Sequence, residues 1–165
     1  MDLIFDSSTL ILLAKITLLR KYVENNRIKI SQNVKPEILF KKELEDTKII
    51  EKLIDEKLIE ELTGKINFEK LIDDFSLDKG EAESLAAAIN YKKILATDDW
   101  KAIKACKVLG IKFITTIHCL IQLYNLGKID QNICLEKLKN LEKFGRYNPD
   151  IIRNAKNIVI GEKNE

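Results

Sequence analysis

Short apolar runs alternate along the chain with longer amphipathic stretches, and this alternation predicts the order of strands and helices. Strands are predicted where a run is short and either continuously apolar or alternating with polar positions, at residues 3–5, 27–31, 94–97 and 112–116. Helices are predicted where apolar residues recur three and four positions apart, at residues 9–23, 47–62, 77–91, 101–109, 117–126, 131–144 and 149–158. Residues 66–75 are ambiguous.

Local signals support several of these boundaries. Ser7 and Ser8 can cap the first helix, and Gly110 can end the helix at 101–109. Pro36 suits the first turn of a further helix that carries Glu37, because that turn does not need the amide hydrogen that proline lacks.

The alternation of strands with helices also predicts the fold class. Such a chain makes right-handed crossovers and forms a parallel sheet that helices cover on both faces. We therefore expect an α/β fold with three α/β/α layers around a central, mainly parallel sheet, followed by a helical C-terminal tail. A chain of 165 residues, 45% of them apolar, fits one domain over residues 1–165, with its core at about 1–120 and a helical extension at about 121–165.

Charge and cysteine content limit the partners and the cellular environment that we expect for this chain. The formal net charge is only +2, from 28 Lys and Arg against 26 Asp and Glu, so any contact with nucleic acid must be local. Cys106, Cys119 and Cys134 are odd in number and lack CxxC spacing, which favours small buried residues in a reducing cytoplasm over disulfides or a zinc site. No apolar run approaches the length of about 18 residues that spans a bilayer, so we expect neither a signal peptide nor a membrane span.

Acidic residues stand where the predicted strands end. Asp6 follows the first strand, Asp98 and Asp99 follow the strand at 94–97, and Glu37 and Glu81 lie at or near helix starts. The carboxyl ends of parallel strands meet at one edge of a sheet, so these acids are expected to converge on one crevice. Converging carboxylates repel one another unless a cation lies between them, and ligands that are all oxygen suit Mg²⁺ or Mn²⁺.

A purely structural explanation competes with this one. An acid near a helix start can simply cap the helix or face its dipole, and for Glu37 and Glu81 taken alone this explanation suffices. It is weaker for Asp6, because Ser7 and Ser8 beside it already offer capping oxygens.

Four segments in chain order resemble motifs of the PIN-domain family. They are LIFDSSTL at 3–10, PE at 36–37, LDKGEAESLA at 77–86 and ILATDD at 94–99. The third is similar to the Gly-Glu-Ala-Glu form of some prokaryotic PIN proteins, and the fourth resembles the Thr-x-Asp strand end that carries the family's last acids. The resemblance covers about residues 1–120 and implies a metal-dependent nuclease.

The resemblance also implies a role for each acid. Asp6, Glu81 and Asp99 would hold metal directly, with Asp98 beside Asp99. Glu37 would bind a second ion or position the attacking water. The residues that would orient the ligands are Ser8 and Thr97.

The sequence leaves open whether Glu81 or Glu83 faces the metal. The two residues flank the buried stripe of their helix on opposite sides, at about 100° per residue. We prefer Glu81, because Asp99 follows it by 18 residues (99 − 81), close to the family's usual separation. The family usually has aspartate at this position, where this chain has glutamate.

Other residues with functional chemistry are interpreted as structural. His118, the only histidine, is expected to pack within its helix, and Trp100 to pack in the core under the first helical turn, with stacking on a base as the alternative. Several lysines could bind phosphate but more simply keep helix faces in water: Lys41, Lys42, Lys101, Lys104 and Lys107. No nucleic-acid-binding residue is therefore identified.

We expect a divalent-metal-dependent endoribonuclease that hydrolyses RNA phosphodiester bonds with Mg²⁺ or Mn²⁺, with the toxin of a toxin–antitoxin pair as one setting. The alternative is a catalytically inactive PIN-like scaffold that binds RNA or protein. Expected partners are RNA, an antitoxin-like protein and a second copy of the chain. The second copy would cover an apolar stripe of the helix at 47–62, unless that stripe packs against the protein's own helices: Ile50, Leu53, Ile54 and Leu58.

Overall fold

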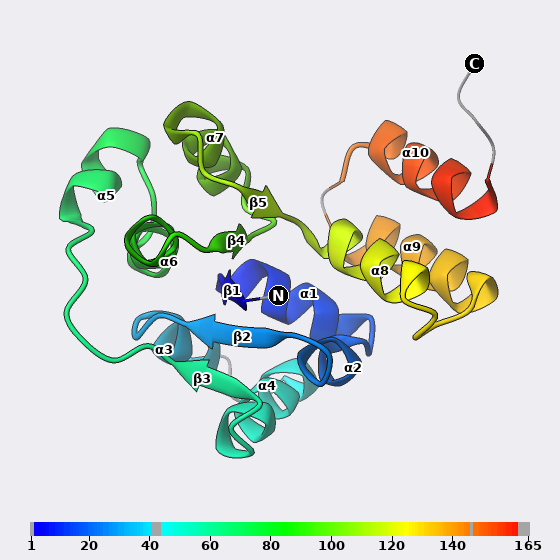
Figure 1. Ribbon diagram of the computed structural model, residues 1–165, viewed down its shortest axis with the longest axis horizontal. Coiled ribbons are helices and arrows are strands. Elements are labelled where there is room, and N and C mark those ends of the chain that lie inside the picture. Colours follow the sequence, from blue (N-terminus) through cyan, green and yellow to red (C-terminus); the bar gives the residue numbers. More distant parts are fainter. Residues whose placement is uncertain (1, 41–43, 146, 162–165) are drawn as a thin grey trace.

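The computed structural model describes residues 2–40, 44–145 and 147–161. Its centre is a five-stranded sheet in the order β3-β2-β1-β4-β5, in which every pairing is parallel. β1 (Asp2–Phe5) lies in the middle, between β2 (Arg27–Ile30) and β4 (Ile94–Ala96). β3 (Ile59–Glu61) and β5 (Phe113–Ile114) form the edges. The expected parallel sheet is confirmed (Figure 1).

The sheet is buried on both faces, which explains the continuous apolar runs of its central strands. Leu3 and Phe5 of β1 belong to one hydrophobic cluster, and Ile4 between them belongs to the other. Successive side chains of a strand point to opposite faces, so a strand without polar positions requires helices on both sides.

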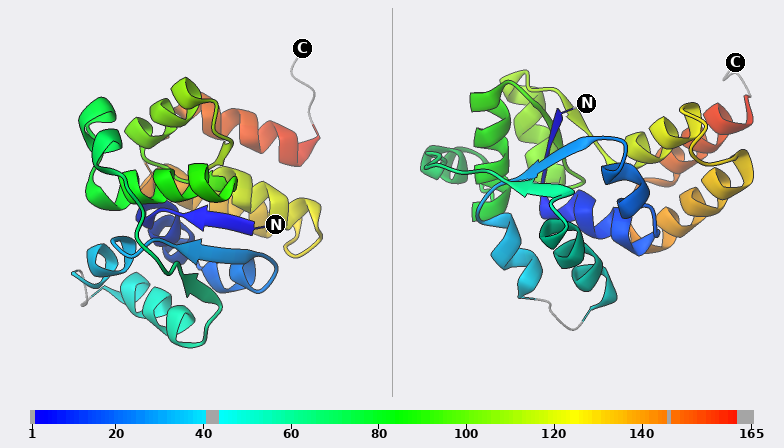
Figure 2. Two further views of the ribbon diagram at one scale, coloured as in Figure 1. Left: turned by 60° about the vertical axis from the view of Figure 1, so that its left-hand side comes forward. Right: turned by 60° about the horizontal axis from the view of Figure 1, so that its bottom comes forward.

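Helices cover each face of the sheet (Figures 1 and 2), so the α/β/α layering is confirmed. On the face of Leu3 and Phe5 pack α1 (Ser7–Lys15), α2 (Leu19–Val23), α3 (Val34–Leu39), α4 (Glu45–Asp55), α8 (Thr116–Asn125), α9 (Gln131–Phe144) and α10 (Pro149–Ile160). On the other face pack α5 (Glu69–Phe75), α6 (Lys79–Tyr91) and α7 (Trp100–Leu109).

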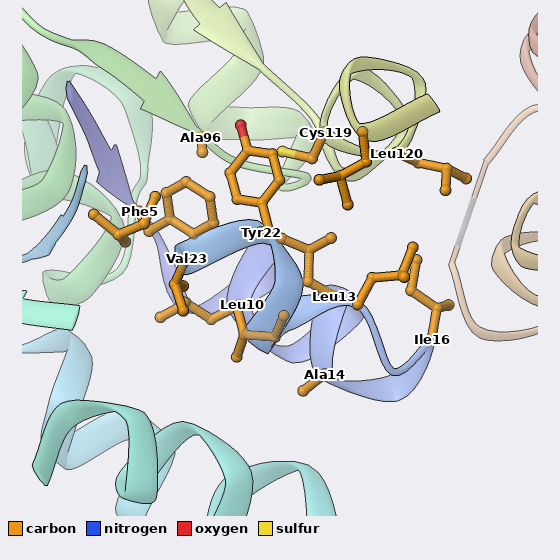
Figure 3. Close-up of a cluster of buried hydrophobic side chains, with 14 of the residues drawn as sticks. Phe5, Leu10, Leu13, Ala14, Ile16, Tyr22, Val23, Ala96, Cys119 and Leu120 are labelled. Atoms are coloured by element: carbon orange, nitrogen blue, oxygen red, sulfur yellow. The ribbon is translucent and has the colours of Figure 1, made fainter. Parts of the chain in front are cut away.

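The C-terminal helices share the core of the first face. Figure 3 shows Phe5 of β1, Tyr22 of α2 and Cys119 and Leu120 of α8 in one buried cluster. The rings of Phe5 and Tyr22 lie 5.8 Å apart, and the Tyr22 hydroxyl donates a hydrogen bond to Gln122 Oε1 at 2.7 Å. α8 is thus joined to the sheet by apolar packing and to α2 by a partly buried hydrogen bond.

Two predicted helices are interrupted. The helix expected at 9–23 is divided into α1 and α2, because Thr17 between them adopts a left-handed backbone with φ of 61°. The helix expected at 47–62 ends at Asp55, where Lys57 has φ of 59° and the chain continues as β3. Non-glycine residues rarely adopt this conformation, so the sequence gives no signal for either break. Within the ambiguous residues 66–75 lies α5.

The apolar stripe of α4 faces the protein's own core. Ile50 and Leu53 are completely buried and Ile54 is nearly so. The expectation that this stripe remains available to a second chain is therefore wrong, and the competing expectation holds. The three cysteines are buried, as expected for small apolar residues. In the part of the chain that the structure describes, no helix combines the length and apolarity needed to span a bilayer.

Candidate active site

All five predicted acids line one cavity of about 750 Å³ at the carboxyl edge of the sheet: Asp6, Glu37, Glu81, Asp98 and Asp99. They come from the ends of β1 and β4 and from the starts of α3 and α6. Segments separated by more than 90 residues meet here because β1 pairs with β4 in parallel, Phe5 beside Ala96.

Asp6 lies at the bottom of this site and is 1% exposed. Its backbone stands at the N-cap position of α1, but its side chain makes no capping hydrogen bond. Instead, the hydroxyls of Ser8 and Thr97 donate to Asp6 Oδ2 at 2.9 and 2.7 Å. The two residues expected to orient ligands therefore contact the most buried carboxylate.

Three consecutive hydroxyl residues at the start of α1 together contact three of the acids. Ser7 donates to Glu37 Oε1 at 2.8 Å and, over the longer distance of 3.4 Å, to Asp6 Oδ1; Ser8 donates to Asp6 Oδ2, and Thr9 to Asp98 Oδ2 at 2.7 Å. Successive helical residues point about 100° apart, so one short run can reach three directions. The sequence reasoning missed Ser7 and Thr9 as site residues, although the run Ser-Ser-Thr directly after Asp6 was a visible signal.

Asp98 is held by several donors. Thr116 donates from its backbone amide and from its hydroxyl, the latter at 2.6 Å, and Thr9 donates from α1. The hydroxyl of Tyr147, between α9 and α10, donates to Asp98 Oδ1. Burial and the charge of Asp98 raise the pKa of Tyr147, so this hydroxyl stays protonated. Both carboxylate oxygens are engaged, an arrangement that suits an anchor between β4, α1 and the tail.

Asp99 caps α7 and keeps one oxygen free of such bonds. Its Oδ1 accepts from the amides of Lys101 and Ala102 at 2.8 and 2.9 Å. Among the described residues, no group donates to its Oδ2. Asp99 can therefore serve the helix and offer a ligand oxygen to the cavity at the same time.

Glu81 and Glu83 have different surroundings. Glu81 lines the cavity with Asp6 and Asp99, while its Oε2 accepts from the Asp78 amide at 2.9 Å in a capping box. Glu83 is 3% exposed, and its Oε2 accepts from the amide and the side chain of Asn33 at 2.7 and 3.0 Å. Glu83 therefore supports the loop that leads into α3, and Glu81 is the acid of this helix that reaches the cavity.

Gly80 explains how Glu37 approaches α6. A Cβ atom built on Gly80 would lie 2.5 Å from Glu37 Oε2, so any larger residue would displace that carboxylate. The carboxylate thus rests against the N-terminal turn of a helix, where the macrodipole favours negative charge. The glycine of the Gly-Glu-Ala-Glu segment has a packing reason that the sequence alone did not reveal.

Burial and the neighbouring negative charges make Asp6 and Glu81 hard to ionise. Burial raises the pKa of Asp6 to about 6, although the hydrogen bonds from the Thr97 and Ser8 hydroxyls lower it. The negative charge of Glu37 adds to the increase. Burial also raises the pKa of Glu81 to about 7, with further increases from the charges of Asp99 and Asp6. Across residues 2–40, 44–145 and 147–161, no lysine or arginine forms an ion pair with any of the five acids.

The donor set fits a hard divalent cation. The groups are oxygens alone, they carry excess negative charge, and opposite charge at the site would restore their ionisation. In the described residues, no three His, Cys, Asp or Glu side chains are already drawn together in a ligating arrangement. Oxygen atoms of Glu37, Glu81 and Asp99 without hydrogen bonds from the described residues would be the ones to turn toward an ion.

His118 and Trp100 lie elsewhere than expected. Trp100 is 66% exposed and lines the cavity, so the prediction that it packs in the core is wrong. It is the first residue of α7, and its position next to the capping residue Asp99 directs it outward. His118 is exposed, and its Nδ1 accepts from the Thr115 amide at 3.2 Å in a capping box at the start of α8, so packing within the helix is also wrong.

The lysines that could bind phosphate have different outcomes. Lys41 and Lys42 lie outside the described residues. The ammonium group of Lys101 donates to the Ser76 carbonyl at 3.1 Å, Lys104 is exposed, and Lys107 lines the cavity.

A three-layer parallel α/β fold with a carboxylate-lined cavity at the strand ends defines the class of PIN-like proteins. The family profile described as PIN domain matches residues 2–159, and the chain belongs to the PIN-domain family. PIN domains are generally nucleases that use divalent metal ions. The resemblance seen in the sequence is thereby confirmed for the family, while the Gly-Glu-Ala-Glu subgroup stays a prediction.

A solved structure from an archaeon supports the fold. A PilT N-terminus domain protein, SSO1118, from the hyperthermophilic archaeon Sulfolobus solfataricus P2 aligns with 75% of this chain and 94% of its own, at 16% identity and a TM-score of 0.51. A domain of a functionally unknown protein from Methanocaldococcus jannaschii DSM 2661 aligns with 69% of this chain and 89% of its own, at 22% identity and a TM-score of 0.45. No curated protein shows a significant match.

Proposed function

We propose that this PIN domain is a divalent-metal-dependent endoribonuclease. The observation that carries the proposal is the cavity at the strand ends, where five acids meet and form no ion pair with any described lysine or arginine. Repelling carboxylates destabilise a fold, so a site of this kind is retained for a cation. An inactive scaffold has no comparable reason to keep these acids.

Each acid has a defined task in this proposal. Asp6, Glu81 and Asp99 hold the ion, and Glu37, oriented by Ser7, binds a second ion or positions the attacking water. Asp98 holds the end of β4 in place and keeps the tail against the cavity. When bound, Mg²⁺ or Mn²⁺ supplies Lewis-acid stabilisation of the phosphate and lowers the pKa of a water molecule.

Calorimetric titration with Mn²⁺ tests the proposal together with an RNA-cleavage assay. The wild type is expected to bind Mn²⁺ and to cleave RNA until EDTA is added. Asp6→Asn, which keeps the side-chain volume but loses the charge, is expected to lose most of the Mn²⁺ binding and most of the RNA cleavage. Asp2→Asn is the matched control, because Asp2 stands at the other end of β1 and pairs with Lys93 at 3.0 Å.

Two results would reject the proposal. One is a wild type that neither binds Mn²⁺ nor cleaves RNA, which would favour the scaffold alternative. The other is equal cleavage by Asp6→Asn and the wild type. The role as a toxin, the antitoxin-like partner, the homodimer and the cytoplasmic location stay predictions of the sequence.

A further inference from the structure

Trp100 is an exposed aromatic residue in the cavity that holds the five acids. It is the first residue of α7, lines the cavity of the five acids and is 66% exposed. An exposed indole gains nothing from the protein's own core, and its two flat faces suit stacking against another aromatic ring. Packing in the core therefore does not explain why a tryptophan stands next to Asp99.

A second exposed aromatic residue lines the same cavity from the C-terminal tail. Phe144, the last residue of α9, is 46% exposed, and Ile151 of α10 beside the same cavity is 50% exposed. The tail thus supplies apolar surface to a cavity whose acids come from the sheet.

The cavity also contains cationic groups without protein partners. Lys15 at the end of α1 and Lys107 on α7 both line it and are exposed. Among the described residues, neither ammonium group forms a hydrogen bond or an ion pair. Aromatic surface combined with unpaired lysines is the combination that binds single-stranded nucleic acid, with bases on the rings and phosphates on the cations.

We propose that Trp100 and Phe144 form a base-stacking subsite that holds one unstacked nucleobase beside the carboxylates, while Lys15 and Lys107 contact neighbouring phosphates. This inference rests on the proposed ribonuclease function and assigns it residues for substrate binding. Within a duplex, neighbouring base pairs already cover both faces of each base. The subsite therefore selects single-stranded or unpaired positions, and it sets which phosphate reaches Asp6, Glu81 and Asp99.

Trp100 is the only tryptophan of the chain, so its fluorescence reports directly on this subsite. The titrant is a short single-stranded oligoribonucleotide in EDTA, which prevents metal-dependent cleavage, and a blunt duplex of the same sequence serves for comparison. The single strand is expected to quench Trp100 with saturation, and the duplex is expected to quench it much less. Phe144→Ala, which keeps the reporter, is expected to weaken binding by about tenfold.

Phe40→Ala is the matched control. Phe40 is 92% exposed and is not among the residues that line the cavity, so its loss is expected to leave binding unchanged. Anisotropy of a labelled oligoribonucleotide extends the test to Trp100 itself. Trp100→Ala is expected to bind about tenfold more weakly, and Trp100→Phe, which keeps a flat ring, to recover most of that loss. Circular dichroism confirms that each variant is folded.

The outcomes separate this inference from the proposed function. Binding without a change in Trp100 fluorescence, equal losses in Phe144→Ala and Phe40→Ala, or no binding of the oligoribonucleotide would each overturn the subsite. The last result would favour a protein partner on this surface. Saturable quenching in a protein that neither binds Mn²⁺ nor cleaves RNA would support the subsite and reject only the nuclease.

Discussion

Replacing Asp6 by asparagine separates the stability of the metal-free protein from its activity. Burial raises the pKa of Asp6 from 3.8 to about 6, so the folded state holds its proton more tightly than the unfolded state does. A pKa unit corresponds to about 1.4 kcal/mol, so ionising Asp6 in the folded protein costs about 3 kcal/mol at pH 8. Asparagine carries no charge and removes this cost.

The sign of the effect follows from the raised pKa. The favourable contribution of protonated Asp6 is complete below about pH 4 and is lost as the pH rises through about 6. The hydroxyls of Ser8 and Thr97 both donate to Oδ2, which the amide oxygen of asparagine can replace. The amide nitrogen then replaces Oδ1 and loses the longer hydrogen bond from Ser7 at 3.4 Å, which offsets part of the gain. We therefore expect Asp6→Asn to be about 1–2 kcal/mol more stable than the wild type at pH 8 in EDTA, with no gain at pH 4.

Thermal unfolding followed by circular dichroism measures this difference. For a chain of this length, 1 kcal/mol corresponds to about 2–4 °C in melting temperature. Millimolar Mn²⁺ is expected to raise the melting temperature of the wild type and to leave that of Asp6→Asn unchanged. Asp2→Asn is the control of opposite sign, because Lys93 lowers the pKa of Asp2 and removal of that charge is expected to reduce stability slightly. A less stable Asp6→Asn at pH 8, or a difference that does not change with pH, would refute the reasoning.

Three further predictions use other parts of the molecule. Gly80→Ala is expected to displace the Glu37 carboxylate and so to lower the rate of RNA cleavage. Urea unfolding is expected to show equal or slightly higher stability, because alanine favours helix over glycine by about 1 kcal/mol. An unchanged cleavage rate would contradict this prediction. Tyr147→Phe removes a donor to Asp98 and is expected to cost about 1–2 kcal/mol in urea unfolding, and a neutral result would argue against the anchor. Leu53→Lys places a charge in the core and is expected to abolish the circular dichroism of the folded state; a folded variant whose light scattering shows only dissociation would be the contrary result.

The sequence predicted best those elements whose burial requires a recognisable run of apolar residues. β1 and β4 are buried on both faces, and their short apolar runs ending in acids indicated both the strands and the side of the sheet where the acids gather. The breaks at Thr17 and Lys57 were missed, because a left-handed backbone at a threonine or a lysine depends on the packing of the surrounding elements.

Within the site, too, the sequence predicted some contacts and missed others. The convergence of five acids on one cavity was predictable because parallel strands end at one edge. The engagement of Asp98 by Tyr147 was not, because the two residues lie 49 positions apart and the tail carries no local signal. The exposure of Trp100 was missed because an aromatic residue in a first helical turn is equally compatible with packing in the core.

The central position of β1 determines when the site can exist during synthesis. β1 is made before its neighbours β2 and β4, which follow about 25 and 91 residues later (27 − 2 and 94 − 3). Parallel pairing over such distances in sequence forms slowly, because the loop must close before any contact is gained. A nascent chain that ends before Ile94 lacks β4 and, with it, Asp98 and Asp99. The proposed cation site is therefore complete only once the chain has been made beyond Asp99 and β4 has paired with β1.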